Sequence, residues 1–148
     1  MKLTIIMPVF NERDTIREIL RRVFSATLSL EKEVIVVDDF STDGSTEILK
    51  EEEEKGIKAC LESVQFKVFY HERNKGKGAA IRTALAHATG DLVIIQDADL
   101  EYDPEDYGKL LTPILKGKAD VVYGSRFTGE RRNMLFWHWI GNRFLTLI

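Results

Sequence analysis

Asp97, Asp99 and Glu101 are acidic residues at alternate positions directly after a short apolar run. In an extended segment, side chains two residues apart point to the same side, so both aspartate carboxylates can face one ion. Hard cations such as Mg²⁺ or Mn²⁺ take oxygen ligands, and substrate phosphate usually completes the shell. The spacing predicts a divalent metal site, with Glu101 as a third ligand, direct or through water. A solvated acidic turn before the next helix is the plainer alternative.

Asp38 and Asp39 end a second apolar run. A carboxylate in that place can accept hydrogen bonds from a ribose hydroxyl or a base N–H. Asp43 and Ser45 are candidate helix caps, which leaves a ligand role for Asp38 and Asp39 open. Residues 39–50 resemble a calcium loop but fail as one, because the twelfth position is a lysine where a bidentate Glu is needed.

Residues 74–78 read Asn-Lys-Gly-Lys-Gly and precede a helical pattern. Glycines before a helix N-terminus are typical of a phosphate cradle. The segment is not a P-loop, because the Gly-Lys-Ser/Thr order is absent. It is also a poor dinucleotide fingerprint, because it follows the third predicted strand and lacks the final Gly. A simple glycine-rich turn remains the alternative.

Short β-branched runs alternate along the chain with longer stretches of helical period, which predicts βαβ units and a largely parallel sheet. The first helix is expected to run from Asn11, as its N-cap, to about residue 26, and the second to start at Asp43 or Ser45. The third helix is expected to follow Gly76 and Gly78 and to end with Gly90 as its C′ residue. A fourth helix is expected to start at Asp103, its N-cap. Ligands of open α/β sheets lie beyond the carboxyl ends of the strands, so polar clusters after each strand predict one shared site. The strands are expected at residues 3–9, 33–37, 66–70, 91–95 and 119–123.

The composition fits one globular domain of 148 residues with 44% hydrophobic residues. A net charge of −3 argues against non-specific nucleic-acid binding. The single cysteine, Cys60, excludes an internal disulfide, and the sequence contains neither a signal peptide nor the ~20 apolar residues of a membrane span.

Residues 134–148 are rich in aromatic side chains, with a narrow polar face. This stretch predicts either an amphipathic helix in a membrane interface or a buried helix whose partners are missing or come from a second subunit. The chain stops within this pattern without a C-cap, so we expect it to be a fragment.

The motifs at residues 8–12, 37–44, 73–78, 96–101 and 124–126 together resemble family 2 glycosyltransferases of the GT-A fold, in particular dolichyl- and polyprenyl-phosphate mannosyl- and glucosyltransferases. The resemblance covers nearly the whole chain. It implies an α/β fold, a Rossmann-like three-layer sandwich with a mostly parallel central sheet. Residues 1–148 would then be a GT-A catalytic domain truncated at its C-terminus.

The resemblance also implies roles for individual residues. Asp97, Asp99 and Arg126 would be catalytic, and Asp97, Asp99 and Glu101 would hold Mg²⁺ or Mn²⁺. Arg126, Arg131 and Arg132 would bind the phosphates of donor and acceptor. The nucleotide-sugar would be bound by Pro8, Val9, Asn11, Glu12, Asp38, Asp39, Lys75, Lys77, Gly78, Asp97 and Ala98.

The implied reaction is metal-dependent inverting transfer of a hexose from GDP-mannose or UDP-glucose to a polyprenyl or dolichyl phosphate, at the cytoplasmic face of a membrane. A lipid phosphate is already anionic near neutral pH, so no protein base is required. One alternative is a nucleotide-sugar-binding fragment without turnover. The other is a haloacid-dehalogenase-like phosphohydrolase, which expects Thr or Val where this chain has Glu101.

Overall fold

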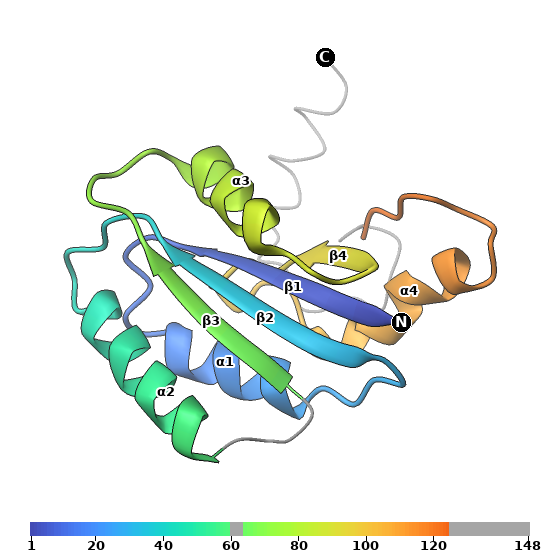
Figure 1. Ribbon diagram of the computed structural model, residues 1–148, viewed down its shortest axis with the longest axis horizontal. Coiled ribbons are helices and arrows are strands. Elements are labelled where there is room, and N and C mark those ends of the chain that lie inside the picture. Colours follow the sequence, from blue (N-terminus) through green and yellow to red (C-terminus); the bar gives the residue numbers. More distant parts are fainter. Residues whose placement is uncertain (60–63, 125–148) are drawn as a thin grey trace, which may run out of the picture. The chain divides into compact units, whose positions relative to one another are not determined.

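A four-stranded parallel sheet forms the centre of the protein in the computed structural model, which describes residues 1–59 and 64–124. The strands lie in the order β3-β2-β1-β4 (Figure 1). Met1–Gly108 form one compact unit, and the chain from Lys109 on belongs to a second. The strands are β1 (Lys2–Val9), β2 (Glu31–Asp38), β3 (Val64–Tyr70) and β4 (Leu92–Ile95).

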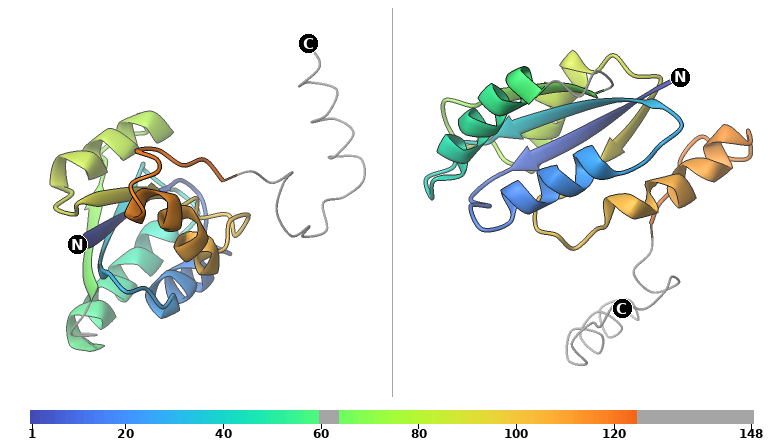
Figure 2. Two further views of the ribbon diagram at one scale, coloured as in Figure 1. Left: turned by 90° about the vertical axis from the view of Figure 1, so that its right-hand side faces the viewer. Right: turned by 90° about the horizontal axis from the view of Figure 1, so that it is seen from below.

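Helices cover both faces of this sheet. Helices α1 (Ile16–Ser25) and α2 (Ser45–Ala59) lie on one face, and α3 (Lys77–His87) lies on the other (Figures 1 and 2). A 3₁₀ turn, η1 (Pro104–Asp106), leads into α4 (Tyr107–Leu115). No helix within residues 1–59 and 64–124 is long and apolar enough to cross a membrane.

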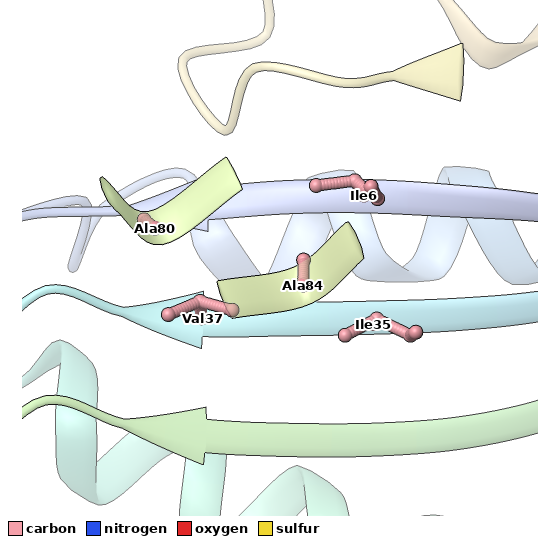
Figure 3. Close-up of a cluster of buried hydrophobic side chains, with 5 residues drawn as sticks. All are labelled: Ile6, Ile35, Val37, Ala80 and Ala84. Atoms are coloured by element: carbon pink, nitrogen blue, oxygen red, sulfur yellow. The ribbon is translucent and has the colours of Figure 1, made fainter. Parts of the chain in front are cut away.

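The core between the sheet and α3 is built from β-branched residues of the strands and alanines of the helix. Ile6 on β1 and Ile35 and Val37 on β2 pack against Ala80 and Ala84 (Figure 3). All five side chains are fully buried. The small alanines let the helix backbone approach the strands closely, and burial of each Ile or Val side chain contributes about 1.5–3 kcal/mol. This packing fixes the start of α3 above the ends of β1 and β2.

Helix α1 buries the apolar face that its sequence predicts, because Ile16, Ile19, Leu20 and Val23 are all inaccessible to solvent. Its predicted start is wrong. The helix begins at Ile16, and Asn11 has a left-handed backbone with φ of 56°. The Asn11 side chain does not cap α1, since its Oδ1 instead accepts a hydrogen bond from the N–H of Thr42.

Two further expectations are corrected. Residues 121–124 have no regular secondary structure, so the fifth strand is not formed within the described chain, and Tyr123 is 91% exposed. Gly90 is not the C′ residue of α3, whose C-cap is Ala88. Gly90 instead lies against β1, where an added Cβ would be 2.6 Å from Thr4 Oγ1 and 2.8 Å from the carbonyl oxygen of Lys2.

Candidate functional site

The strand order reverses between β1 and β4, and this is the position where open α/β sheets bind ligands. The chain runs outward from β1 to β3 and then returns to place β4 on the other side of β1. A cleft of about 240 Å³ lies beyond the carboxyl ends of these strands. Segments after all four strands contribute to it. Its lining residues are Pro8, Val9, Phe10, Glu12, Asp39, Asn74, Gly76, Lys77, Ala80, Asp97, Ala98 and Asp99.

The segment after β4 brings two carboxylates to the cleft. Asp97 and Asp99 both line it, and the side chain of the intervening Ala98 is buried. Asp99 Oδ1 accepts a hydrogen bond from the N–H of Glu101 at 3.0 Å, which closes the turn. Asp97 Oδ1 lies 2.6 Å from the ammonium nitrogen of Lys77, the first residue of α3. Charged groups of both signs therefore face one small volume.

The side chain of Gln96 supports the turn that contains Asp97 and Asp99. Its side chain is buried, and its amide nitrogen donates to the carbonyl oxygens of Asp97 and Tyr102. Its Oε1 accepts a 2.7 Å hydrogen bond from the hydroxyl of Tyr107. Burial, with a smaller contribution from the Asp103 carboxylate, raises the pKa of Tyr107, so this hydroxyl remains a donor. The position of Asp97 and Asp99 is thus set by a polar network under the loop.

Asp39 connects the end of β2 to the glycine-rich loop. Its Oδ1 accepts from the N–H of Lys75 at 2.9 Å, and its Oδ2 accepts from the N–H of Gly76 at 2.7 Å. His71 Nδ1 lies 2.6 Å from the same Oδ1. Burial by itself would raise the pKa of Asp39, but the hydrogen bonds from His71 and the two backbone groups outweigh it and lower the pKa. Asp39 is therefore anionic at neutral pH and already bound to protein donors.

Polar side chains tie the loop after β1 to the loop after β2. The N–H groups of Asn11 and Glu12 donate to the hydroxyls of Ser41 and Ser45, both at 2.9 Å. Asp43 accepts from the N–H of Arg13 and from Ser45. This cross-linking shapes the cleft wall formed by residues 8–12.

Several predicted site residues lie outside the lining of the cleft. Asp38 is buried and accepts hydrogen bonds from the N–H of Ser41 and the hydroxyl of Thr46. The lining also does not include Asn11, Lys75, Gly78 or Glu101. Arg126, Arg131 and Arg132, and the stretch 134–148, lie outside the described residues.

Asn74 and Gly76 line the cleft and belong to the segment 74–78, which was predicted as a candidate phosphate cradle. Two other lining residues, Phe10 and Ala80, were not predicted individually as binding residues. Phe10 is 48% exposed, and an exposed aromatic ring next to a polar cleft offers a flat apolar surface. The signal available for it was its position, since it directly follows the last residue of β1.

Three non-glycine residues with left-handed backbone lie just after strands at this edge. They are Asn11, Phe40 and Leu100, with φ of 56°, 67° and 64°. Asn tolerates this conformation, whereas it is strained for large side chains and concentrates at functional sites. The backbone geometry therefore points to the same edge as the cleft.

The chemistry of the donor set fits a divalent cation. Asp97 and Asp99 offer only carboxylate oxygens, which Mg²⁺ and Mn²⁺ prefer. The Lys77 ammonium at 2.6 Å from Asp97 shows that a positive group is accommodated there. Within the described ranges, no three His, Cys, Asp or Glu side chains are grouped closely enough to hold an ion by themselves. Two carboxylates would therefore need further oxygens from phosphate or water.

Known proteins with related sequences are sugar transferases. Dolichol-phosphate mannosyltransferase of Pyrococcus furiosus is 33% identical over 139 residues, which are 93% of this chain and 37% of that protein. Undecaprenyl-phosphate 4-deoxy-4-formamido-L-arabinose transferase of Klebsiella pneumoniae is 37% identical over 124 residues, covering 82% of this chain and 35% of that protein. The chain thus spans about a third of the length of these relatives.

Solved structures with the same fold include a mannosyltransferase and a protein in complex with a nucleotide-sugar. The mannosyltransferase PcManGT from Pyrobaculum calidifontis, in complex with GDP-Man and Mn²⁺, has a TM-score of 0.62 and 32% identity, covering 80% of this chain and 32% of that one. Residues 1–349 of S. aureus TarS, in complex with UDP-GlcNAc, have a TM-score of 0.64 and 27% identity, covering 92% of this chain and 38% of that one. The expected GT-A fold, with its parallel central sheet and helices on both faces, is confirmed.

The profile described as Glycosyl transferase family 2 matches residues 4–146, nearly the whole sequence. This match includes every lining residue of the cleft, strands β2, β3 and β4, and β1 from residue 4 on. Because the match includes Asp97 and Asp99, it excludes the alternative that these residues form a haloacid-dehalogenase-like active site. The chain belongs to glycosyltransferase family 2.

Proposed function

We propose that this chain is the donor-binding part of an inverting, metal-dependent glycosyltransferase that moves a hexose from a nucleotide-diphosphate sugar to a polyprenyl phosphate. The observation that carries the proposal is the cleft at the switch point, where Asp97, Asp99 and Lys77 meet the segments after β1 and β2. The relatives named for dolichol phosphate and undecaprenyl phosphate support the acceptor class.

The charges of the cleft suit a diphosphate leaving group. Negative charge develops on the leaving oxygen when the glycosidic bond to the nucleotide breaks. Mg²⁺ or Mn²⁺ bound by Asp97 and Asp99 would stabilise that charge electrostatically. Lys77 can pair with a phosphate oxygen, because its exposed side chain reaches the same volume. The described part of the site thus binds and orients the donor.

The nucleoside would lie on the other side of the cleft. Phe10 offers an exposed ring for stacking, and Glu12 and Asp39 also line the cleft. Both oxygens of Asp39 already accept hydrogen bonds, but a carboxylate has about four acceptor positions and retains capacity for a base or ribose donor.

The acceptor would be bound by residues beyond the described part. Arg126, Arg131 and Arg132 follow the cleft segments in sequence, and arginine binds phosphate in a planar, bidentate way. A lipid phosphate monoester needs no protein base, because its second pKa is ~6. Residues 134–148 would bring the enzyme to the cytoplasmic surface of a membrane through their aromatic side chains.

The test is binding of GDP-mannose and UDP-glucose to this chain with Mn²⁺ and with EDTA, measured by thermal shift and calorimetry. Ligands that bind the native state raise its melting temperature. We expect one of the two sugars to bind in Mn²⁺ and to lose most of its affinity in EDTA. Failure of both to bind would overturn the proposal. Binding without transfer to a polyprenyl phosphate by the longer protein would identify a binding domain without turnover.

A further inference from the structure

His71 is a buried histidine beside the cleft to which the proposed chemistry gives no role. It follows β3 directly and is 8% exposed. Its Nδ1 lies 2.6 Å from Asp39 Oδ1, and its Nε2 lies 2.9 Å from Thr83 Oγ1. Both ring nitrogens therefore have a partner, and the imidazole connects the end of β2 to helix α3.

The same carboxylate holds the glycine-rich loop. Asp39 accepts hydrogen bonds from the N–H groups of Lys75 and Gly76, and Gly76 is the N-cap residue of α3. The next residue, Lys77, reaches Asp97 in the cleft. The orientation of the Asp39 side chain therefore determines the position of residues 74–77, the loop that lines this part of the cleft.

These contacts form a closed ring. It runs from Thr83 in α3 to His71, on to Asp39, and back through the loop into the first turn of α3. With its proton on Nδ1, the imidazole of His71 donates to Asp39 and accepts from the Thr83 hydroxyl. Both nitrogens of His71 therefore have a hydrogen-bond partner within this network. A buried network that is fully satisfied rigidifies the groups that it connects.

We propose that His71 is a positioning residue for the nucleotide-sugar donor. It orients Asp39, and through Asp39 it holds residues 74–77 in the conformation that binds the diphosphate side of the donor. His71 does not line the cleft, so its effect is exerted through Asp39 and not by contact. This inference rests on the proposed function, because it requires that the cleft bind a nucleotide-sugar.

Two substitutions separate the hydrogen bond from the bulk of the ring. His71→Asn places an amide N–H near the position of Nδ1, whereas His71→Leu keeps an apolar side chain and donates nothing. The probe is whichever of GDP-mannose and UDP-glucose binds the unsubstituted chain, titrated with Mn²⁺ by calorimetry. We expect His71→Leu to weaken binding about 10- to 100-fold. We expect His71→Asn, which keeps a donor to Asp39 and loses only the contact with Thr83, to weaken it by about threefold.

The matched control is His87→Asn, since His87 lies exposed near the end of α3, stacked on Phe69, and away from Asp39. It should bind the donor normally. If His71→Leu does not fold, Thr83→Val and Thr83→Ser decide the matter, because only the serine keeps the hydroxyl that contacts Nε2. We expect the valine variant to bind more weakly than the serine variant.

The outcomes that overturn the inference are specific. The inference is wrong if a folded His71→Leu variant binds the donor as tightly as the unsubstituted chain. It is also wrong if His71→Leu and His71→Asn lose the same amount of donor affinity. Equal binding by the two Thr83 variants would have the same force where His71→Leu is unfolded. Failure of the unsubstituted chain to bind either sugar would instead overturn the proposed function, and the positioning role with it.

Discussion

Lys77 and Asp97 form an ion pair inside the candidate site, with 2.6 Å between the ammonium nitrogen and Oδ1. The Lys77 side chain is 58% exposed and the Asp97 side chain 23%. An ion pair this open to solvent contributes at most about 1 kcal/mol to stability. Its consequence is local, because it places a movable positive charge on a carboxylate that we propose as a metal ligand.

Substituting Lys77 should therefore change metal and diphosphate binding in opposite directions. Lys77→Met removes the charge and keeps an apolar stem. Mn²⁺ alone should then bind roughly 3- to 10-fold more tightly, because no ammonium competes for Asp97. GDP or UDP at saturating Mn²⁺ should bind more weakly. Calorimetric titrations measure both, and Lys50→Met is the control, since Lys50 is an exposed lysine of α2 that does not line the cleft. Identical Mn²⁺ affinities in the two variants would refute this prediction.

Asp99→Asn should weaken metal-dependent donor binding without unfolding the chain. Asp99 Oδ1 accepts from the N–H of Glu101, and an Asn side chain keeps that acceptor while losing the negative charge. We expect donor affinity in Mn²⁺ to fall by about 10- to 100-fold, and affinity in EDTA to stay as it is. Asp103→Asn is the control, because Asp103 caps η1 and Asn is an equally good N-cap. A donor that binds equally well in Mn²⁺ and in EDTA would exclude the metal role.

The strands and the buried face of α1 could be predicted because both depend on local apolar periodicity. The runs that form β1 and β2 are nearly continuous, which is typical of strands covered on both faces. The predicted fifth strand had the same local pattern at residues 119–123 and is not formed in the described chain. A strand also needs a partner edge, and the local sequence carries no information about one.

The roles of individual polar residues were harder to predict. Asp38 and Asp39 are neighbours in sequence, but successive side chains of a strand point to opposite faces. Asp38 turns to Thr46 on α2, and Asp39 turns to His71 and the loop before α3. The partners of Asn11 lie 30 or more residues away, so no local pattern reveals them. Only the tertiary structure therefore shows that Asp39 lines the cleft, whereas Asp38 and Asn11 support the loops around it.

Glu33 should make stability depend on pH below neutrality. This fully buried carboxylate on β2 accepts hydrogen bonds from Thr89, Lys67 and Thr4. Burial alone would raise its pKa, but these donors outweigh burial and lower the pKa from 4.5 to about 2. Since the folded-state pKa lies below the unfolded value, the stabilisation is complete above pH 4.5 and is lost as the pH falls toward 2.

Urea unfolding of the Glu33→Gln variant measures how much the ionised Glu33 carboxylate contributes to the free energy of unfolding. At pH 7 the variant should be less stable than the unsubstituted chain by up to about 3 kcal/mol, reduced by solvent around the partly exposed Lys67. The difference should shrink as the pH is lowered from 5 toward 2. Glu31→Gln, at the exposed start of β2, should change stability by less than about 0.5 kcal/mol throughout. A Glu33→Gln difference that stays constant over this pH range would contradict the assignment.

Gly76 and Gly78 should respond differently to alanine, although they are neighbours in one motif. Gly76 has φ of 85° and ψ of 156°, a conformation open essentially only to glycine. Gly76→Ala should cost about 1–3 kcal/mol and weaken donor binding, because it displaces the N–H that Asp39 accepts. Gly78 lies in the first turn of α3, where an added Cβ would meet only an Arg82 nitrogen at 3.8 Å. Gly78→Ala should stabilise the chain by about 0.5 kcal/mol.

Comparing donor binding by these two variants decides what the glycine-rich motif does. If the motif is a turn whose geometry depends on Gly76 alone, Gly78→Ala binds the nucleotide-sugar like the unsubstituted chain. If phosphate approaches the backbone at both glycines, as in a phosphate cradle, a methyl group at Gly78 also obstructs it. We expect the first result, because Gly78 does not line the cleft. Weaker donor binding by a Gly78→Ala variant of full stability would establish the cradle instead.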